Sequence, residues 1–335
     1  MERYIYQLEF TTPVRFGESE HSVHLSNCSY VADASLLYSA ISNEWVSIFG
    51  VEDYEKFVEK VKKDEFTLSG LLPYFDDELY VPKPILYVER DALNKEKDDA
   101  NSSEIKKKMK KLNFIPISHF NDYLDFVKGV SDLSFDYVSS FATEISNTRA
   151  SISRESDVDT LPYVVSGYKF HEKSGLYFII ETCENLKEKL DVIMKSLSLT
   201  GIGGKRSSGF GKFELVDEAY ILDEEYPLYS CDEHLARLID VKGDYYMSLS
   251  IVKPSYTDMS DFIDNENFYK LTKKSGFVFS KDYAKNHLKK KDSYVFDMGS
   301  CFCKKLDGSL VDVSTNQGTH PVYLYGKSLY LGVKL

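Results

Sequence analysis

The stretch LKEKLDVIMKSLSLTGIGGKRSSGFGKFEL, from Leu186 to Leu215, contains a helical pattern, a glycine-rich loop and the start of a strand in direct succession. Its first half places leucine and isoleucine at helical spacing up to Leu197, which predicts an amphipathic helix that ends at Gly201. Its end leads into FGKFELVDEAYI, whose aromatic and β-branched residues predict a strand. The loop from Gly201 to Lys212 is therefore predicted to connect a helix directly to a strand.

Five of the 18 glycines of the chain lie in this glycine loop, where they alternate with Lys205, Arg206, Ser207, Ser208 and Lys212. Glycine permits positive φ and the close approach of another chain, while successive N–H groups, hydroxyls and cations favour an anion. A tight helix-to-strand turn with solvated charges is the alternative interpretation. The glycine loop is a candidate anion site.

Two familiar nucleotide-binding motifs do not fit the glycine loop. A Rossmann fingerprint requires glycine where Arg206 stands, and it follows a strand and opens a helix, which is the reverse of the order here. A Walker loop requires four residues between its first glycine and Gly-Lys-Ser/Thr, and no such frame surrounds Gly204. A polymeric phosphate backbone therefore fits better than a mononucleotide.

The elements around the loop predict an α+β fold. The segment YIYQLEFTTPV predicts a strand that ends at Pro13, and Asp33 is a candidate N-cap for a helix that runs toward Trp45. The segments YVVSGYKFH and GLYFIIE, joined by a turn at Glu172–Ser174, predict a hairpin. Strand, helix, two strands, helix, strand is the order of a ferredoxin-like unit, the plan of an RNA-recognition motif.

A chain of 335 residues exceeds the usual size of one compact domain, so we expect two. The first spans 1–224, with a large insertion at about 50–161 and the glycine loop at 201–212. Residues 225–335 predict a second, degenerate ferredoxin-like domain with an antiparallel sheet and a helix at Asp258–Tyr269. Partial helical patterns occur there in NFYKLTKK and DYAKNHLKK.

The composition predicts a folded protein with an acidic surface. Hydrophobic residues make up 43% and aromatic residues 14%, and the formal net charge is -12. Since proteins that bind nucleic acid by overall charge are usually basic, RNA would have to bind at local basic stretches. Three such stretches occur, namely KKKMKK at 106–111, TRASISR at 148–154 and GGKRSSGFGK at 203–212. KKKMKK follows an acidic run and reads better as a solvated segment than as an RNA groove.

Membrane, secreted and metal-dependent classes are disfavoured. The opening MERYIYQLEF does not resemble a signal peptide, and no apolar run approaches the roughly 18 residues of a membrane span. We therefore expect a cytoplasmic protein that does not bind membranes. Five scattered cysteines without a C-x-x-C pair predict neither a disulfide framework nor a zinc site, and we expect no metal and no cofactor.

The loop GIGGKRSSGFGKFEL resembles the signature of the RAMP superfamily of CRISPR proteins. Other phrases narrow the resemblance to the fourth subunits of the Csm complex, the type III-A CRISPR effector. In chain order they are YQLEFTTPVRFG, ADASLLYSAI, LPYFDDELYVPKP, KKLNFIPISHF, SGLYFIIE, KKSGFVFS and THPVYLYGKSLYL.

This resemblance implies two ferredoxin-like units and a function in antiviral defence without catalysis. The subunit would hold the 5′ handle of the CRISPR RNA and dock the large polymerase-like subunit, within a complex that also contains a backbone RAMP subunit. The residues that the resemblance assigns to RNA are Gly201, Gly203, Gly204, Lys205, Arg206, Ser207, Ser208 and Gly209 in the loop, Arg149, Ser151 and Arg154 before the predicted hairpin, and His21.

An alternative function is metal-independent cleavage of CRISPR RNA. Some RAMP relatives use a histidine after the first strand as general base, and His21 and His24 occupy that region. Such cleavage needs a base at the 2′-hydroxyl, an acid at the leaving oxygen and cations for the developing charge. Histidines in a polar loop are more often solvated, so binding without catalysis is our prediction and an endoribonuclease using His21 is the alternative. A third interpretation is a protein scaffold whose excess acidity faces partner subunits.

Overall fold

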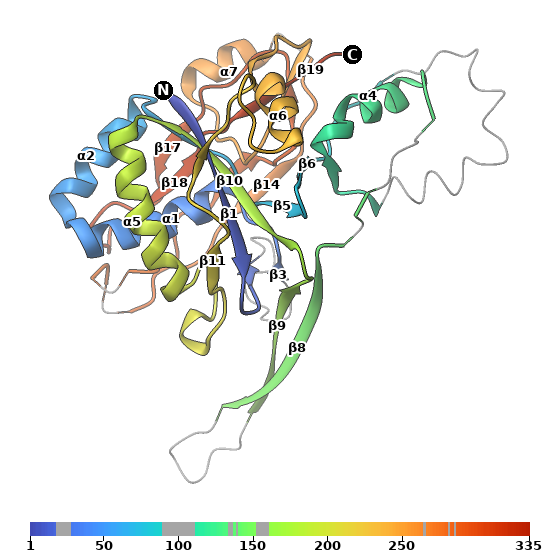
Figure 1. The fold of residues 1–335 in the computed structure, drawn as a ribbon. Coiled ribbons are helices and arrows are strands. Elements are labelled where there is room, and N and C mark those ends of the chain that lie inside the picture. The colour runs from blue at the N-terminus through green and yellow to red at the C-terminus, as the bar shows by residue number, and fades with distance from the viewer. Residues whose placement is uncertain are drawn as a thin grey trace.

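The computed structural model describes residues 1–17, 28–88, 111–132, 137–138, 140–151, 161–263, 266–280, 282–284 and 286–335. Helices pack on a large central sheet, and a C-terminal part with smaller sheets adjoins it (Figure 1). The helices are α1 (Ala34–Phe49), α2 (Val51–Lys62), α4 (Phe120–Lys128), α5 (Glu184–Thr200), α6 (Ser230–Asp240) and α7 (Tyr256–Ile263), with 3-10 turns η3 (Ile117–His119) and η4 (Arg206–Ser208). Within these ranges, every helix is too short or too polar to cross a membrane.

The central sheet is antiparallel, with the order β11-β1-β10-β5-β6-β7, while β12 pairs with β1 and β4 pairs with β10. In the middle of the sheet, Tyr6 lies opposite Phe178 and their stacked ring centroids are 4.8 Å apart. The strands predicted at both ends of the first unit are confirmed. The strands of this sheet are β1 (Glu2–Phe10), β4 (Phe66–Leu68), β5 (Leu72–Phe75), β6 (Glu78–Pro82), β7 (Phe114–Pro116), β10 (Ser174–Thr182), β11 (Phe213–Leu215) and β12 (Tyr220–Ile221).

Helices α1, α2 and α5 lie together on one side of the central sheet (Figure 1). The predicted N-cap is confirmed, because the Asp33 carboxylate accepts a hydrogen bond of 3.0 Å from the N–H of Leu36 at the start of α1. At the corner with α2, Trp45 stacks on Phe57 with ring centroids 4.1 Å apart. The cap fixes the start of α1, which lines the candidate site described below, and the stacking fixes its other end against α2.

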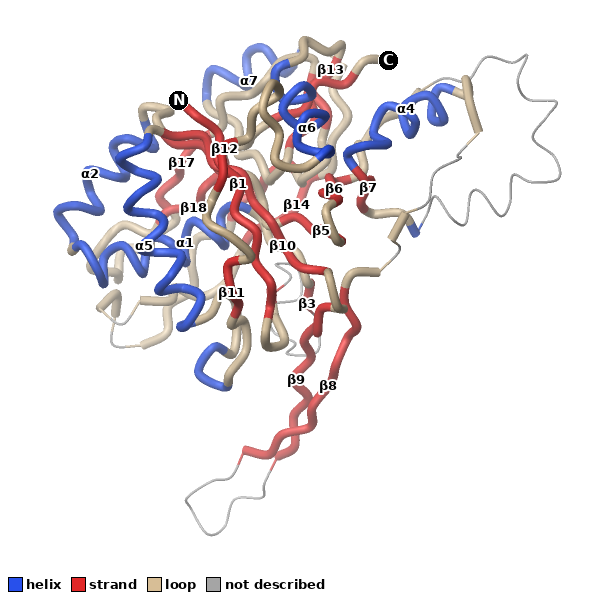
Figure 2. The backbone as a smooth tube through the Cα atoms, viewed as in Figure 1, coloured by secondary structure: helices blue, strands red, loops and turns tan. Residues whose placement is uncertain are grey.

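Strands β8 (Ala142–Ser151) and β9 (Leu161–Phe170) form a two-stranded ribbon that projects from the body of the molecule (Figures 1 and 2). Its base is attached to the segment after β1, since Val14 and Tyr168 exchange two backbone hydrogen bonds of 2.8 Å. The ribbon therefore begins beside the first strand of the central sheet.

The predicted hairpin of YVVSGYKFH with GLYFIIE is wrong. The two segments follow each other, but β9 pairs with β8, while β10 lies between β1 and β5. The physical reason is burial: eight of the nine residues of β10 are buried, so it needs a partner on each edge, whereas β9 leaves Val164 43% exposed. In addition, β4 to β7 come from the segment predicted as an insertion and belong to the central sheet.

Residues beyond Leu222 form α6, α7 and three small antiparallel sheets. The expected helix at Asp258–Tyr269 is the shorter α7. The helical pattern in NFYKLTKK is wrong, because Leu271 of this segment lies in a strand opposite Phe296. The small sheets consist of β16 (Cys301–Phe302), β13 (Tyr245–Ser248) and β19 (Tyr330–Val333) in that order, of β14 (Leu271–Lys274) with β15 (Ser293–Phe296), and of β17 (Ser309–Asp312) with β18 (Tyr323–Gly326); β2 (Phe16–Gly17) pairs with β3 (Cys28–Ser29) elsewhere.

The C-terminal part shares a hydrophobic core with the first 224 residues. Tyr325 of β18 is fully buried and stacks on Tyr38 of α1, with ring centroids 5.0 Å apart. Its hydroxyl accepts a hydrogen bond of 3.0 Å from the N–H of Leu68 in β4. At the other end of the contact, Arg3 of β1 donates two hydrogen bonds to Asp240 of α6, at 2.7 and 2.8 Å. Core and ion pairs thus fix the C-terminal part against α1.

Candidate nucleic-acid interface

The glycine loop is closed on itself by its backbone. After α5 the chain turns at Gly201, which has a φ of 83°. At the far end of the loop the chain returns, and the N–H of Ile202 donates a hydrogen bond of 2.9 Å to the carbonyl of Gly211. A Cβ atom on Gly211 would lie 2.0 Å from the carbonyl oxygen of Ile202, and one on Gly201 would lie 2.8 Å from that of Phe210. Glycine is therefore required at both ends of the loop for steric reasons.

The loop is also anchored to the segment that follows β1. The N–H of Gly211 donates 2.8 Å to the carbonyl of Pro13, and the N–H of Gly204 donates 2.8 Å to that of Arg15. Between these anchors the backbone of Lys205 has a φ of 61°, an unusual value for a residue other than glycine. The loop thus presents Lys205 and Arg206 from a backbone that is fixed at both sides.

The ribbon of β8 and β9 brings a further cation to the loop. The Arg149 guanidinium lies 5.9 Å from the centre of the Phe210 ring, and the Lys205 ammonium lies 5.6 Å from that of Tyr163. Arg149 and the glycine loop are thus neighbours, whereas in the sequence they are far apart. Ser151 is the last residue of β8, and Arg154 and His21 lie outside the described residues.

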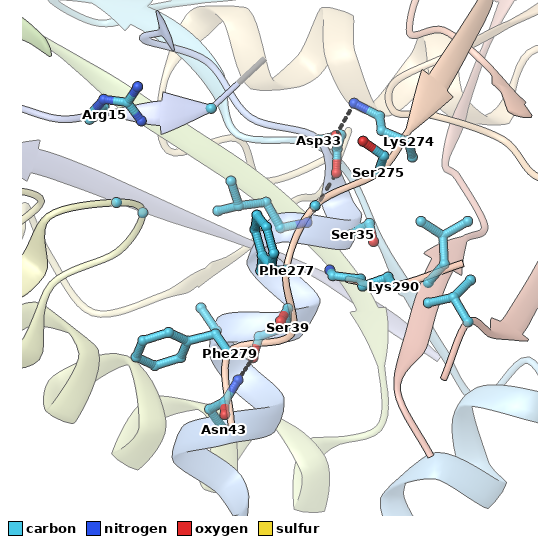
Figure 3. A pocket seen from close by; sticks show the side chains of 18 of the residues that line it. Arg15, Asp33, Ser35, Ser39, Asn43, Lys274, Ser275, Phe277, Phe279 and Lys290 are labelled. Carbon is cyan, nitrogen blue, oxygen red and sulfur yellow. Dashed lines mark hydrogen bonds and ion pairs between the residues drawn. The ribbon is translucent and has the colours of Figure 1, made fainter. Parts of the chain in front are cut away.

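Beside the loop lies a cleft of about 350 Å³ between α1, the loop and the C-terminal segment 274–291 (Figure 3). Among its described lining residues, Asp33 is the one carboxylate. The cations that line it are Arg15, Arg206, Lys274, Lys290 and Lys291. In a protein of net charge -12, this excess of cations makes the cleft a local site for anions.

The carboxylate of Asp33 is already engaged. It lies 2.6 Å from the Lys274 ammonium and caps α1. Burial raises the pKa of Asp33, but the Lys274 charge and the hydrogen bonds from Lys274 and the Leu36 N–H outweigh this, so that the pKa lies below its ordinary value of 3.8. Burial also lowers the pKa of Lys290 below 10.5. Asp33 thus offsets the charge of Lys274, and the attraction of the cleft for anions rests on Arg15, Arg206, Lys290 and Lys291.

Sequence reasoning missed four of the five cations of the cleft. Arg15, Lys274, Lys290 and Lys291 come from segments that were not singled out as basic, and only Arg206 was predicted. A signal was present in the run Lys289–Lys291, which follows an exposed pair of phenylalanines. In the described ranges, we find no group of three or more His, Cys, Asp or Glu side chains arranged to hold a metal ion.

Replacing Asp33 by asparagine is expected to separate two properties of this cleft. Asparagine caps helices as well as aspartate does, so α1 should still start at Ala34. Removal of the negative charge should tighten the binding of a polyanion to the cleft about threefold at low salt, because Asp33 no longer offsets the positive charge there. The loss of the ion pair should lower the free energy of unfolding by ~1 kcal/mol.

The measurements are binding of a single-stranded RNA to the chain at two salt concentrations and urea denaturation of the chain. Asp122→Asn on α4, an exposed carboxylate outside the cleft, is the control. Weaker RNA binding in Asp33→Asn would show that the ion pair positions Lys274 for binding, contrary to this expectation.

Family models and curated relatives show to which protein family the chain belongs. The model described as "RAMP superfamily" matches residues 7–214, and "CRISPR Csm4 C-terminal domain" matches residues 241–333. The protein named "CRISPR system Cms protein Csm4" of Mycobacterium tuberculosis (strain CDC 1551 / Oshkosh) is 30% identical over 333 residues, which cover 99% of this chain and 98% of that protein. Its namesake in Streptococcus thermophilus is 31% identical over 283 residues, covering 84% and 85% of the two chains.

Solved structures with a similar fold agree with these matches. One is described as "Crystal structure of Csm3-Csm4 subcomplex in the type III-A CRISPR-Cas interference complex", with a TM-score of 0.61, 20% identity and 99% of both chains covered. Another is "Crystal structure of Csm1-Csm4 cassette in complex with cA4", with a TM-score of 0.62, 18% identity, and 99% and 98% covered. The chain belongs to the RAMP superfamily and, within it, to the Csm4 family of type III-A CRISPR subunits.

Proposed function

We propose that this protein is a non-catalytic subunit of a type III-A CRISPR effector that holds the 5′ handle of the CRISPR RNA in the cytoplasm, in antiviral defence. The observation that carries this proposal is the cleft, in which the glycine loop meets α1 and the C-terminal part and cations outnumber carboxylates. A phosphodiester chain is a polymer of single negative charges, so a row of fixed cations and N–H groups binds it without reading bases.

The proposed architecture is two ferredoxin-like units. For residues 1–224 it is supported by the order β11-β1-β10-β5, with α1 after β1 and α5 after β10, where β4 and β5 take the place of the predicted second strand. For residues 225–335 it is supported by the order β16-β13-β19, with α7 after β13. In this arrangement the glycine loop precedes the last strand of the first unit.

The loop geometry supports the following proposed roles for its residues. Lys205 and Arg206 neutralise phosphates, and the exposed Ser207 and Ser208 hydroxyls donate hydrogen bonds to phosphate oxygens. The glycines, which have no side chain, let the RNA backbone approach the loop closely. Arg149 binds the same strand from the ribbon, beside Phe210. The remaining residues proposed to contact RNA are Gly201, Gly203, Gly204, Gly209, Ser151, Arg154 and His21.

We further propose that the chain docks the large polymerase-like subunit and a backbone RAMP subunit. The support is that similar chains are found in structures described as a Csm1-Csm4 cassette and a Csm3-Csm4 subcomplex. We propose that the chain presents a separate face to each of these partners. The net charge of -12 supplies acidic surface for such contacts away from the cleft.

Co-expression with candidate large and backbone subunits tests the assembly and the ligand together. The expected result is a complex that copurifies with CRISPR RNA, whose handle crosslinks to this chain and whose sequence begins with repeat-derived nucleotides. An assembled complex in which this chain does not crosslink to RNA would instead support the scaffold interpretation.

The enzymatic alternative needs its own assay. Purified chain incubated with repeat RNA and EDTA should leave the RNA intact, because the proposal assigns no general base. Cleavage in EDTA that disappears in His21→Ala would contradict the proposal and establish the metal-independent endoribonuclease.

A further inference from the structure

Two phenylalanines are exposed at the rim of the cleft. Phe277 and Phe279 are 62% and 68% exposed, and they are the only exposed phenylalanines among the described residues. A large aromatic ring left in water forgoes the favourable transfer that burial would give it. Both rings line the cleft that carries the cations (Figure 3).

The backbone holds the two rings on one side. The segment of Phe277 pairs with the segment of Lys289 in an antiparallel bridge. The N–H of Val278 donates a hydrogen bond of 2.9 Å to the carbonyl of Leu288, and the N–H of Lys290 donates one of 2.8 Å to the carbonyl of Gly276. In such an extended pairing, alternate side chains point to opposite sides. Val278 is only 8% exposed, so the rings on either side of it in sequence point away from the core.

A guanidinium from the glycine loop already stacks on one of these rings. The Arg206 guanidinium carbon lies 4.8 Å from the centre of the Phe279 ring, although the two residues belong to different parts of the chain. Ser39 and Asn43 of α1 line the same cleft with a hydroxyl and an amide (Figure 3). Ring, cation and polar side chains thus converge on one space of about 350 Å³, within the usual range of sites for small ligands.

We propose that Phe279 stacks on the base of one unpaired nucleotide of the bound RNA, while Lys290 and Lys291 hold its phosphate. This inference rests on the proposed function and adds to it a base-stacking site contributed by the C-terminal part. Both faces of a base inside a duplex are covered by its neighbours, so only an unpaired base can stack on a protein ring. Because every base has a π-face, stacking on Phe279 does not discriminate among bases.

An acidic peptide is the competing occupant, and it fits less well. Carboxylates would satisfy the lysines, but they would leave both rings in water. A nucleotide satisfies both features, because it joins a planar ring to a phosphate, and Phe279 and Lys290 line the same cleft.

The test uses the assembled effector complex bound to guide RNAs that carry 2-aminopurine at each handle position in turn. We expect quenched fluorescence at one position, and Phe279→Ala should raise the fluorescence at that position severalfold and weaken RNA retention about tenfold. Phe279→Trp should restore the quenching, since it keeps a stacking face. Tyr256→Ala removes a 95% exposed ring of the C-terminal part outside the cleft and is the matched control.

The outcomes separate this inference from the proposed function. If Phe279→Ala leaves the fluorescence unchanged at every position while Lys205→Ala/Arg206→Ala releases the RNA, the stacking site is wrong and RNA binding stands. If neither variant affects the RNA, both proposals fail. Loss of a partner subunit in Phe279→Ala, without a change in fluorescence, would assign the rings to a protein contact and overturn the stacking site.

Discussion

Replacing both Lys205 and Arg206 by alanine is expected to weaken retention of the guide RNA roughly 10- to 100-fold, since each charge-assisted contact to phosphate contributes more than a neutral hydrogen bond. Both side chains extend from a loop whose backbone is fixed to Pro13 and Arg15, so they bind without a large loss of entropy. The salt dependence should also flatten. For single-stranded RNA, two lost phosphate contacts should reduce the slope of log affinity against log salt by about 1.4.

The measurement is RNA retention by the purified complex across a salt series, with the double variant Lys56→Ala/Lys63→Ala as a control. Those two lysines are exposed on and just after α2, outside the cleft, and their removal changes the net charge by the same amount. An equal loss of RNA in both double variants would mean that overall charge, rather than the loop, governs binding.

Replacing Gly211 by alanine is expected to weaken RNA retention to the same extent as removal of the two cations. The added Cβ atom would lie 2.0 Å from the carbonyl oxygen of Ile202, and the φ of 78° is strained for alanine. The hydrogen bonds from Ile202 to Gly211 and from Gly211 to Pro13 cannot both persist, so the loop should open. We expect the free energy of unfolding to fall by about 3 kcal/mol or more.

Urea denaturation and RNA retention measure the two effects. Gly50→Ala is the matched control, because Gly50 has a φ of 83° but no atom within 4 Å of an added Cβ. It should show a backbone strain of about 1 to 3 kcal/mol without loss of RNA. If Gly211→Ala behaves like Gly50→Ala in both assays, the close packing of Ile202 on Gly211 does not maintain the loop.

The parts of this protein that the sequence predicted are those decided by short-range chemistry. Asp33 caps α1 because its carboxylate reaches an N–H three residues on, and Gly201 ends α5 because the chain there needs a positive φ. The glycine loop could be predicted between a helix and a strand for the same reason. The proximity of Arg149 to this loop came from the family resemblance, since residue spacing gave no sign of it.

The remaining features depend on contacts between distant segments. The sequences of β9 and β10 both predict strands. Because β10 is buried and pairs on both edges, with β1 and β5, β9 pairs with β8 instead. From the sequence alone, the run Lys289–Lys291 would be interpreted as a solvated basic patch. In the structure it pairs with the segment of Phe277, and Lys290 and Lys291 line the cleft beside α1. Helix α6 was not predicted, because the sequence around Ser230 is polar and charged residues separate the residues that the helix buries.

The burial of Tyr325 between α1 and β4 has a consequence for the order of events during protein synthesis. When the glycine loop has just been synthesised, β18 has not yet been translated. Tyr38 and Leu68 can therefore contact Tyr325 only after a further part of the chain has left the ribosome. The lysines of segment 274–291 also emerge after the loop. The proposed RNA site is therefore complete only on chains translated at least as far as Tyr325, and a chain truncated before Tyr325 should bind the guide RNA more weakly.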